Sequence, residues 1–364
     1  MTPRLTAAAC RTALGDADQT CSALLDGKVA LQPLPVLGVQ GGDLVPLALI
    51  GDRTLDETAP PAWLPVLDSL LVDLPAAPWG DPSHPVFVTS SNFGVGSLYA
   101  FQRTKVAAHL AYGTPFLSVE CLRRRFGWGP NVVLLSHACV SAQLGLLAAS
   151  RQLEAGLAER ALVFTYDFIS PFVTGGFHAL KILNGEFPAP YADRPTGAIG
   201  LGDGCAFAVL EPDGRGPVIL GQSLYNEMHH FTANRPDGAG FSGCLSALAP
   251  LAAGRKLWIK GHGTGTLEAG KLEAETLGRL FPGCPLVSWK GSLGHTLGSC
   301  GLVELAVAAA ALRFGSTPGT VGSSAPVFAP TVATAAFDNR RFDTVLLASN
   351  AFGGAHAACL LAYD

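Results

Sequence analysis

One internal repeat constrains this 364-residue chain more than any other feature of its sequence. Residues 129–156 run from an apolar, strand-like stretch through a short polar loop into a helix of small residues, and residues 283–315 repeat that order. Each copy continues into a second apolar strand and, after a glycine turn, a final strand, at 202–211 in the first copy and 353–362 in the second. Four matching elements in the same order predict a duplicated α/β unit.

The stretch EPDGRGP at 211–217 is charged and rich in turn-forming residues. Few contacts are expected to cross such a segment, so we place a boundary there. The sequence therefore predicts an N-terminal half over residues 1–212 and a C-terminal half over residues 213–364.

Apolar stretches bounded by Gly and Pro predict strands, and longer stretches rich in small apolar residues predict helices. The expected strands are 85–90, 132–136, 161–166, 205–211, 256–260 and 344–349. The expected helices are 139–157, 268–280 and 299–313.

Charge and cysteine spacing exclude several classes of function. A net charge of −4 without a long Lys/Arg run gives no footprint for nucleic acid or an anionic membrane. The nine cysteines contain no CxxC pair, so neither a disulfide framework nor a metal site is expected. The most apolar helical stretch, 301–312, is shorter than a membrane span and contains Glu304, and the N-terminus lacks a signal-type apolar core. We expect a cytoplasmic protein.

Cys139 and His295 lie in the loops that precede the two small-residue helices. A pseudo-twofold axis between the copies would place the thiol beside the imidazole. The positive end of a helix dipole and its free N–H groups favour a thiolate and can stabilise an oxyanion. Cys139 is therefore a candidate nucleophile, and a cysteine that merely fills the core is the alternative.

Three further motifs carry candidate chemistry. His262 lies in the glycine-laced stretch KGHGTGT after an expected strand, where a flexible backbone lets the imidazole approach a substrate. A phosphate cradle is the competing interpretation, but the spacing differs from the dinucleotide fingerprint. Lys290 lies five residues before His295, and Phe352 lies among small residues in SNAFGG.

In this order the motifs resemble the β-ketoacyl synthases of the thiolase superfamily, in particular the elongating, two-histidine type of fatty acid and polyketide synthesis. FGWGPNVVLLSHACVSAQLG resembles their strand and nucleophile loop, and HGTGT followed by Glu273 resembles their first histidine loop. KGSLGHT resembles their Lys-x-x-x-x-His loop, and AFGGAHAA resembles their terminal gating loop. The resemblance implies a thiolase-like α/β fold, with duplicated halves in a five-layered αβαβα sandwich.

The resemblance also implies catalytic roles. Cys139 would carry the acyl chain as a thioester, and its N–H and that of Phe352 would form an oxyanion hole. His262 and His295 would promote decarboxylation of the malonyl thioester and donate hydrogen bonds to the enolate. Phe352 would also gate the acyl pocket.

Two further residues would support this site. Lys290 and Glu273 would form a buried charge pair that organises the histidine loops. His356 stands where the family usually has Asn, which implies a changed hydrogen-bond partner below the active site.

The implied reaction is the decarboxylative Claisen condensation of an acyl thioester with malonyl-acyl carrier protein, in fatty acid, polyketide or aryl polyene type synthesis. No cofactor is expected, because decarboxylation drives the condensation. One alternative is a non-catalytic, chain-length-factor-like subunit of a heterodimeric condensing enzyme. Another is an acyl-transferring synthase that makes esters or amides.

The implied partners are an acyl carrier protein and a second copy or a second synthase-like chain. We expect residues 160–168 to pair across the dimer, with Phe164 near the axis. The basic cluster at 121–127 is either a docking surface for an acidic carrier protein or a solvated helix end.

Overall fold

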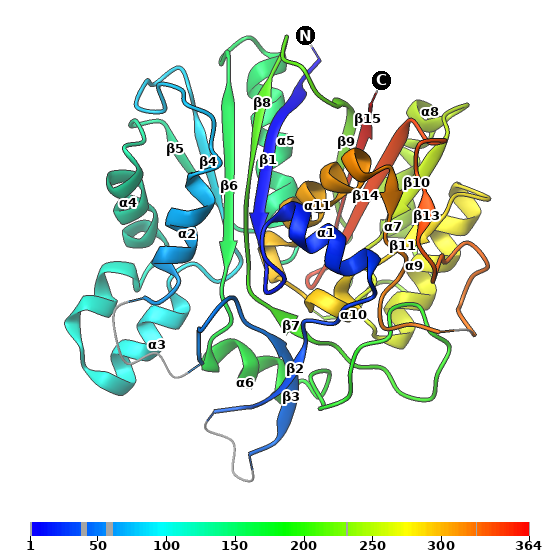
Figure 1. Ribbon diagram of the computed structural model, residues 1–364, viewed down its shortest axis with the longest axis horizontal. Helices are drawn as coiled ribbons and strands as arrows, with labels where there is room; N and C mark the ends of the chain where they lie inside the picture. The colour runs from blue at the N-terminus through cyan, green and yellow to red at the C-terminus, as the bar shows by residue number, and fades with distance from the viewer. Residues whose placement is uncertain (1, 38–41, 56–60, 231, 325, 364) are drawn as a thin grey trace.

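The computed structural model describes residues 2–37, 42–55, 61–230, 232–324 and 326–363. Ten strands in the described part form one mixed sheet (Figure 1). In spatial order they are β11 (Leu286–Val287), β10 (Leu257–Lys260), β14 (Thr344–Ala351), β15 (Ala355–Ala362), β9 (Val218–Asn226), β1 (Arg4–Arg11), β8 (Gly204–Glu211), β6 (Ala161–Asp167), β4 (Val86–Thr89) and β5 (Val132–Leu135).

The strand order repeats on the two sides of the β1–β9 junction. These two strands pair at Arg4 and Val218. Outward from there, β1–β8 and β8–β6 are antiparallel, whereas β6–β4 and β4–β5 are parallel. The series β9, β15, β14, β10 and β11 has the same sequence of directions. The duplicated α/β unit is therefore confirmed, while the division at 212/213, which falls between β8 and β9, stays a prediction.

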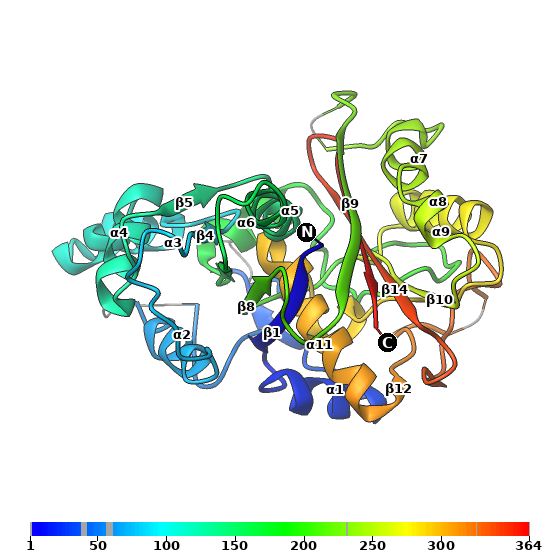
Figure 2. The same cartoon turned by 90° about the horizontal axis from the view of Figure 1, so that it is seen from above.

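Helices form three further layers around the two halves of the sheet (Figure 2). The central layer holds α5 (Ser141–Glu154), α11 (Cys300–Phe314) and α1 (Ala17–Leu25). The outer layers hold α2 (Leu64–Leu71) and α4 (Pro115–Phe126) on one side, and α7 (Ala239–Ser246), α8 (Ala249–Ala252) and α9 (Leu267–Leu280) on the other.

Alternation along the strands explains the layers. In β6, Val163 packs into the central cluster while Phe164 packs into the outer cluster of α2 and α4. In β14, Leu347 faces the centre and Leu346 faces the outer cluster of α7 and α9. Because successive strand residues point to opposite faces, each half-sheet must be covered on both sides. The predicted five-layered, thiolase-like fold is confirmed.

The remaining described elements are short. They are β2 (Gln32–Pro35), β3 (Leu44–Ala48), α3 (Val95–Thr104), η1 (Ala107–Tyr112), α6 (Pro171–Ala179), β7 (Leu201–Gly202), α10 (Lys290–Leu293), η2 (Leu297–Ser299), β12 (Ser316–Thr317) and β13 (Phe337–Asp338). Strands β2, β3 and β7 form a small second sheet, and β12 pairs with β13.

All of the strands and helices expected from the sequence are present, with shifts at their ends. One helical stretch in the described residues, Leu297–Phe314, which extends beyond the expected apolar stretch 301–312, is long and apolar enough to cross a membrane by length and composition alone. This stretch is 78% buried inside the protein, as expected for a core helix. The cytoplasmic location stays a prediction.

The expectation that residues 160–168 pair across a dimer is wrong. Strand β6 is an inner strand that pairs with β8 on one side and β4 on the other. Phe164 is fully buried and packs edge-on against Trp128 at 5.2 Å between ring centroids. The outermost strand on this side is β5, where Leu134 remains 37% exposed.

Candidate active site

Cys139 lies in the tight turn between β5 and α5. The turn contains Ala138 in the left-handed region, with φ of 45°. Ser141 stabilises it, because its Oγ accepts a hydrogen bond from the His137 N–H at 2.7 Å and donates one to the Ala138 carbonyl at 2.7 Å. The predicted strand, turn and helix around Cys139 are therefore confirmed, with the helix beginning at Ser141.

His295 faces Cys139 from the corresponding loop of the second half. Its Nε2 lies 3.0 Å from Cys139 Sγ. The backbone is fixed on both sides, because the His295 N–H donates to the Gly200 carbonyl at 2.7 Å and its carbonyl accepts from Gly202 N–H at 3.1 Å. His295 precedes α11 by five positions, whereas Cys139 precedes α5 by two, so they are not equivalent positions of the repeat. The predicted thiol and imidazole pair nevertheless forms.

His262 lies directly after β10, with its ring 5.0 Å from that of His295 and perpendicular to it. Glu273, on α9, holds this loop from behind. Its carboxylate accepts hydrogen bonds from the His262 N–H at 2.5 Å and the Gly263 N–H at 2.8 Å. Tyr191 donates its hydroxyl to the same carboxylate at 3.1 Å. Glu273 thus positions the His262 backbone.

Phe352 begins the three-residue connection between β14 and β15. Its N–H donates toward the Cys139 sulfur, while its ring stacks on Phe177 of α6 at 5.9 Å between centroids. Gly353 and Gly354 follow with φ of 86° and 72°, a backbone that glycine adopts without strain. Phe352 therefore presents its backbone N–H to the thiol while 37% of the residue stays exposed.

The expected charge pair between Lys290 and Glu273 is wrong. Lys290 Nζ lies 2.5 Å from Glu304 Oε1, and Lys260 Nζ lies 2.8 Å from Glu304 Oε2. Glu273 instead uses its carboxylate oxygens on backbone N–H groups. The sequence reasoning missed Lys260 and the role of Glu304, although a single acid within the apolar run 301–312 was a signal for a buried partner.

Burial sets the protonation of the site. It lowers the pKa of both His262 and His295 well below the ordinary value, and the Lys290 ammonium lowers them further. Burial also raises the pKa of the Cys139 thiol well above its ordinary value, against the opposing effects of Lys290 and the Phe352 N–H. These shifts oppose the expectation of a thiolate, because burial favours the neutral thiol of Cys139 and the neutral imidazoles of His262 and His295.

His356 lies under the Phe352 turn and is fully buried. Its Nδ1 lies 2.7 Å from Asn350 Oδ1, across the hairpin of β14 and β15. Its Nε2 lies 3.5 Å from Glu227 Oε2. His356 therefore supports the base of the Phe352 turn. Among the described residues, it makes no hydrogen bond to Cys139.

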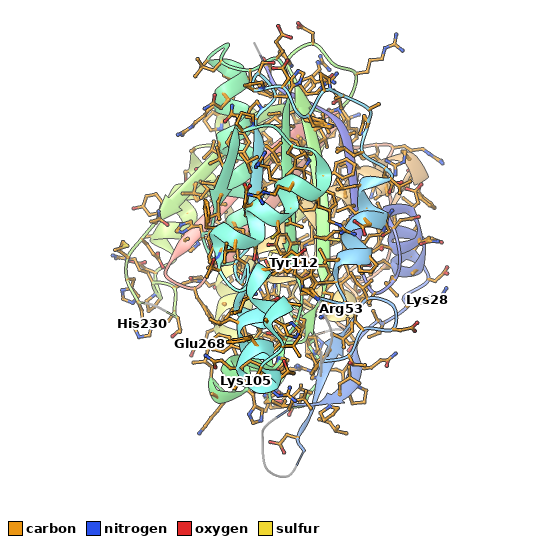
Figure 3. The ribbon with its side chains drawn as sticks, turned by 90° about the vertical axis from the view of Figure 1, so that its left-hand side faces the viewer. Lys28, Arg53, Lys105, Tyr112, His230 and Glu268 are labelled. Carbon is orange, nitrogen blue, oxygen red and sulfur yellow. The ribbon has the colours of Figure 1, made fainter. Side chains whose placement is uncertain are left out.

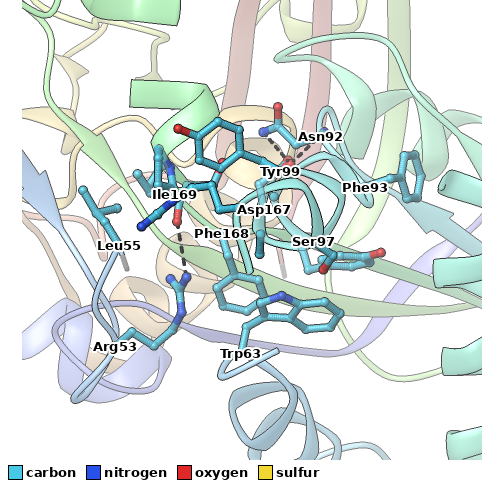
Figure 4. Close-up of a pocket in the computed structure, with 16 residues that line it drawn as sticks. Arg53, Leu55, Trp63, Asn92, Phe93, Ser97, Tyr99, Asp167, Phe168 and Ile169 are labelled. Carbon is cyan, nitrogen blue, oxygen red and sulfur yellow. Dashed lines mark hydrogen bonds between the residues drawn. The ribbon is translucent and has the colours of Figure 1, made fainter. Parts of the chain in front are cut away.

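A cavity lies between α3 and the segment that follows β6 (Figure 4). Its buried acid, Asp167, accepts hydrogen bonds from Ser90 Oγ at 2.8 Å and Asn92 Nδ2 at 3.0 Å, and burial raises its pKa to about 6. Gly298 lies between this acid and the turn that contains Cys139. A Cβ atom added to Gly298 would lie 2.8 Å from Asp167 Oδ2 and 3.0 Å from the Ala138 carbonyl oxygen, so Asp167 is close to that turn. Aromatic rings form much of the wall: Trp63, Phe93, Tyr99, Tyr166 and Phe168. The sequence reasoning missed this cavity.

Two further points concern metal ligands and the basic cluster at 121–127. Among the described residues, no group of three or more His, Cys, Asp or Glu side chains could hold a metal ion. The basic cluster is paired within the chain: Arg123 and Arg124 bind Glu120 at 2.7 and 2.6 Å, and Arg125 binds Asp68 at 2.5 Å. This pairing favours the solvated helix end over a carrier docking surface.

Parts of the chain match known proteins in sequence. Residues 217–324 match the family described as beta-ketoacyl synthase, C-terminal domain. The ketoacyl synthase alpha subunit of the tetracenomycin polyketide synthase from Streptomyces glaucescens is 30% identical over 262 residues, which are 64% of this chain and 60% of that protein. The 3-oxoacyl-[acyl-carrier-protein] synthase 2 of Coxiella burnetii is 28% identical over 260 residues, 64% of this chain and 62% of that one. The matches thus span about three fifths of these relatives.

A solved structure shares the fold over the full chain. A chain in the complex of a ketosynthase with its chain length factor from Xenorhabdus doucetiae superposes with a TM-score of 0.84 at 20% identity, covering 100% of this chain and 98% of that one. Residues 217–324 therefore resemble the C-terminal domain of beta-ketoacyl synthases, the named relatives are ketoacyl and 3-oxoacyl synthases, and the chain shares its fold with a ketosynthase complex.

Proposed function

We propose that the chain is an acyltransferase that condenses an acyl group on Cys139 with a malonyl group delivered by an acyl carrier protein. The observation that carries the proposal is the meeting of Cys139 Sγ with His295 Nε2 at 3.0 Å, beside the His262 ring and the Phe352 N–H. The relatives are a ketoacyl synthase subunit and a 3-oxoacyl-[acyl-carrier-protein] synthase, which supports both a condensing reaction and an acyl carrier protein as the carrier.

In the first step Cys139 takes the acyl group. Its sulfur attacks the carrier thioester, the bond to the carrier sulfur breaks, and the thiol proton passes to the departing carrier thiolate. Because the thiol is neutral at rest, it needs a base, and the neutral His295 Nε2 is the nearest one. The N–H groups of Cys139 and Phe352 stabilise the oxyanion of the tetrahedral intermediate.

In the second step the malonyl carboxylate leaves as CO₂, and its bonding electrons form the enolate of the carrier thioester. His262 and His295, each in the neutral tautomer with the proton on Nε2, donate hydrogen bonds to that enolate oxygen. His295 reaches this tautomer after the first step, when its ring loses the Nδ1 proton and takes up one on Nε2. The enolate carbon then attacks the acyl carbon. Collapse of the tetrahedral intermediate expels the Cys139 thiolate, which takes up one proton and leaves the lengthened β-ketoacyl group on the carrier.

We further propose that the chain works as a dimer through the β5 edge. Figure 3 faces this side of the molecule, where Tyr112 of η1 and Lys105 at the end of α3 are labelled. Phe116, on α4, is 73% exposed and Leu134, on β5, is 37% exposed. An open sheet edge with apolar neighbours is a site for strand pairing. The partner is a second copy or a second synthase-like chain, such as the factor that accompanies the ketosynthase of Xenorhabdus doucetiae.

Intact-mass measurement tests the proposal. The purified protein is incubated with a panel of acyl-carrier proteins and then with malonyl-carrier protein. We expect one acyl increment on the wild-type chain, its absence in Cys139→Ala, and a β-ketoacyl product on the carrier after the second addition. A protein that never acquires an acyl group would instead be a non-catalytic subunit, and an acylated protein that never decarboxylates malonyl-carrier would be an ester- or amide-forming transferase.

A further inference from the structure

Lys260 is a fully buried lysine at the end of β10, two residues before His262. Its Nζ lies 2.8 Å from Glu304 Oε2 and donates a hydrogen bond to the Gly261 carbonyl at 2.5 Å. The ammonium also lies 5.7 Å from the centre of the Trp289 ring. A buried ammonium is costly unless it is paired and hydrogen-bonded, so this arrangement calls for a functional reason.

The single carboxylate of Glu304 joins both histidine loops. Glu304 Oε2 forms an ion pair with Lys260, and Lys260 donates a hydrogen bond to the carbonyl of Gly261, the residue before His262. Oε1 holds Lys290, which begins α10 and precedes the His295 loop. Two ammoniums thus share one carboxylate, and the cluster carries an excess positive charge behind the two imidazoles.

We propose that Lys260 is a positioning residue for both histidines: it ties the His262 loop to Glu304, and as a second buried cation it keeps the imidazoles of His262 and His295 uncharged. The inference rests on the proposed function, because an uncharged imidazole is the form that stabilises the enolate by hydrogen bonding alone.

The surrounding charges support this role. The pKa of His262 and that of His295 are lowered by both lysine ammoniums, in addition to burial. Burial lowers the pKa of Lys260 itself to about 8, and Lys290 adds to that effect while Glu304 opposes it. The titratable groups that face this cluster from the packed elements are Glu304 and Cys300 of α11, Lys290 of α10, Glu273 of α9, the two histidines and Tyr191.

Lys260→Met tests the proposal by removing the charge while keeping an unbranched side chain. The first readout is the pKa of His262 and of His295, followed by NMR of protein labelled in its histidine rings and assigned with His262→Ala and His295→Ala. We expect both pKa values to rise by about one unit, as the loss of a nearby buried cation predicts. Lys271→Met is the matched control, because it removes an exposed lysine from α9 and should leave both values unchanged.

The second readout is the pH profile of malonyl-carrier decarboxylation. Wild-type activity should fall above about pH 8, because a deprotonated Lys260 loses the ion pair that ties the His262 loop to Glu304. In Lys260→Met that alkaline decline should disappear, and the acid limb should move toward neutral pH. Lys260→Arg, which keeps the charge, should retain an acid limb close to that of the wild type.

If Lys260→Met fails to fold, a titration of the wild-type protein still tests the role of Lys260. Titration of Lys260 near pH 8 should produce a second inflection in the ring signals of both histidines. Unchanged histidine pKa values in a folded Lys260→Met protein, or the absence of that inflection, would overturn the proposal. The NMR readouts need no turnover, so responsive histidines in a protein without decarboxylase activity would reject the proposed function and not the role of Lys260.

Discussion

His295 Nε2 lies 3.0 Å from Cys139 Sγ although 156 residues separate them in the sequence. Both residues precede helices of the central layer, α5 and α11. The beginnings of these helices are in contact, since the Cys300 thiol at the start of α11 bonds to the Cys139 carbonyl at 3.4 Å. The duplicated fold therefore builds one site from two loops, each of which would be incomplete alone.

Cys139→Ala should abolish formation of the acyl-enzyme with little effect on folding, because the side chain is partly exposed in a turn fixed by Ser141. Intact mass after incubation with acyl-carrier protein measures the first effect, and thermal unfolding measures the second. Cys284→Ala removes another partly exposed cysteine and should acylate normally. An acyl increment on Cys139→Ala would assign the nucleophile to another residue.

His262→Ala and His295→Ala should each lower malonyl decarboxylation by about 10²-fold or more, the usual effect of losing a preorganised hydrogen-bond donor to a developing oxyanion. The two variants should differ in the acylation step. His262→Ala should acylate normally, whereas His295→Ala should acylate more slowly, because His295 Nε2 lies within hydrogen-bond distance of Cys139 Sγ and is the base proposed for the thiol. Rapid-quench mass spectrometry separates these steps, and normal decarboxylation in either variant removes that histidine from the mechanism.

The internal repeat predicted the duplicated α/β unit and the pairing of thiol and imidazole, whereas the five layers were implied by the resemblance to the β-ketoacyl synthases. The sequence failed for Lys290 because the choice of partner depends on packing between layers, which brings Glu304 of α11 closer than Glu273 of α9. It failed for the thiolate because the local sequence around Cys139 does not reveal the burial that raises the pKa of its thiol. The edge strand was misassigned because strand order is set by tertiary contacts and has no local signal in the sequence.

Glu304→Gln should strongly destabilise the protein, because it leaves the buried ammoniums of Lys260 and Lys290 without their carboxylate. Breaking a buried ion pair on one side costs about 3–5 kcal/mol. Urea unfolding measures the free energy of unfolding. The control is Glu275→Gln, which removes an exposed glutamate paired with Lys271 at 3.9 Å and should change that free energy by less than about 1 kcal/mol. Equal stabilities of the two variants would contradict the role of Glu304.

The free energy of unfolding should fall as the pH drops below about 6.5. The pKa values of His262 and His295 are lowered in the folded protein, so below the ordinary value of 6.5 the unfolded chain binds protons that the folded chain does not. Each such group contributes a loss of up to roughly 1.4 kcal/mol per pH unit. Asp167 acts in the opposite direction, because its pKa is raised to about 6.

A double variant isolates the histidine effect from that of the buried carboxylates. His262→Gln with His295→Gln carries no imidazole to protonate and should lose less stability between pH 7.5 and pH 5.5 than the wild type does. Urea unfolding at the two pH values gives the comparison. Equal losses would show that these histidines are not held uncharged by the fold.

Substitutions at the β5 edge should break the dimer. Strand β5 pairs with β4 along one side, from Val132 to Leu135, and Leu134 of β5 and Phe116 of α4 are exposed. Leu134→Lys with Phe116→Asp places charges where a second sheet edge would dock, and burying unpaired charge opposes association. Light scattering at micromolar concentration should show a dimer for the wild type and a monomer for this variant. The control is Leu251→Asp on α8, an exposed leucine on the opposite side of the molecule (Figure 1), which should stay dimeric. A wild-type protein that is monomeric and fully active alone would reject the dimer, whereas a wild type that pairs only when co-expressed with a second synthase-like chain would assign the β5 edge to a heterodimer.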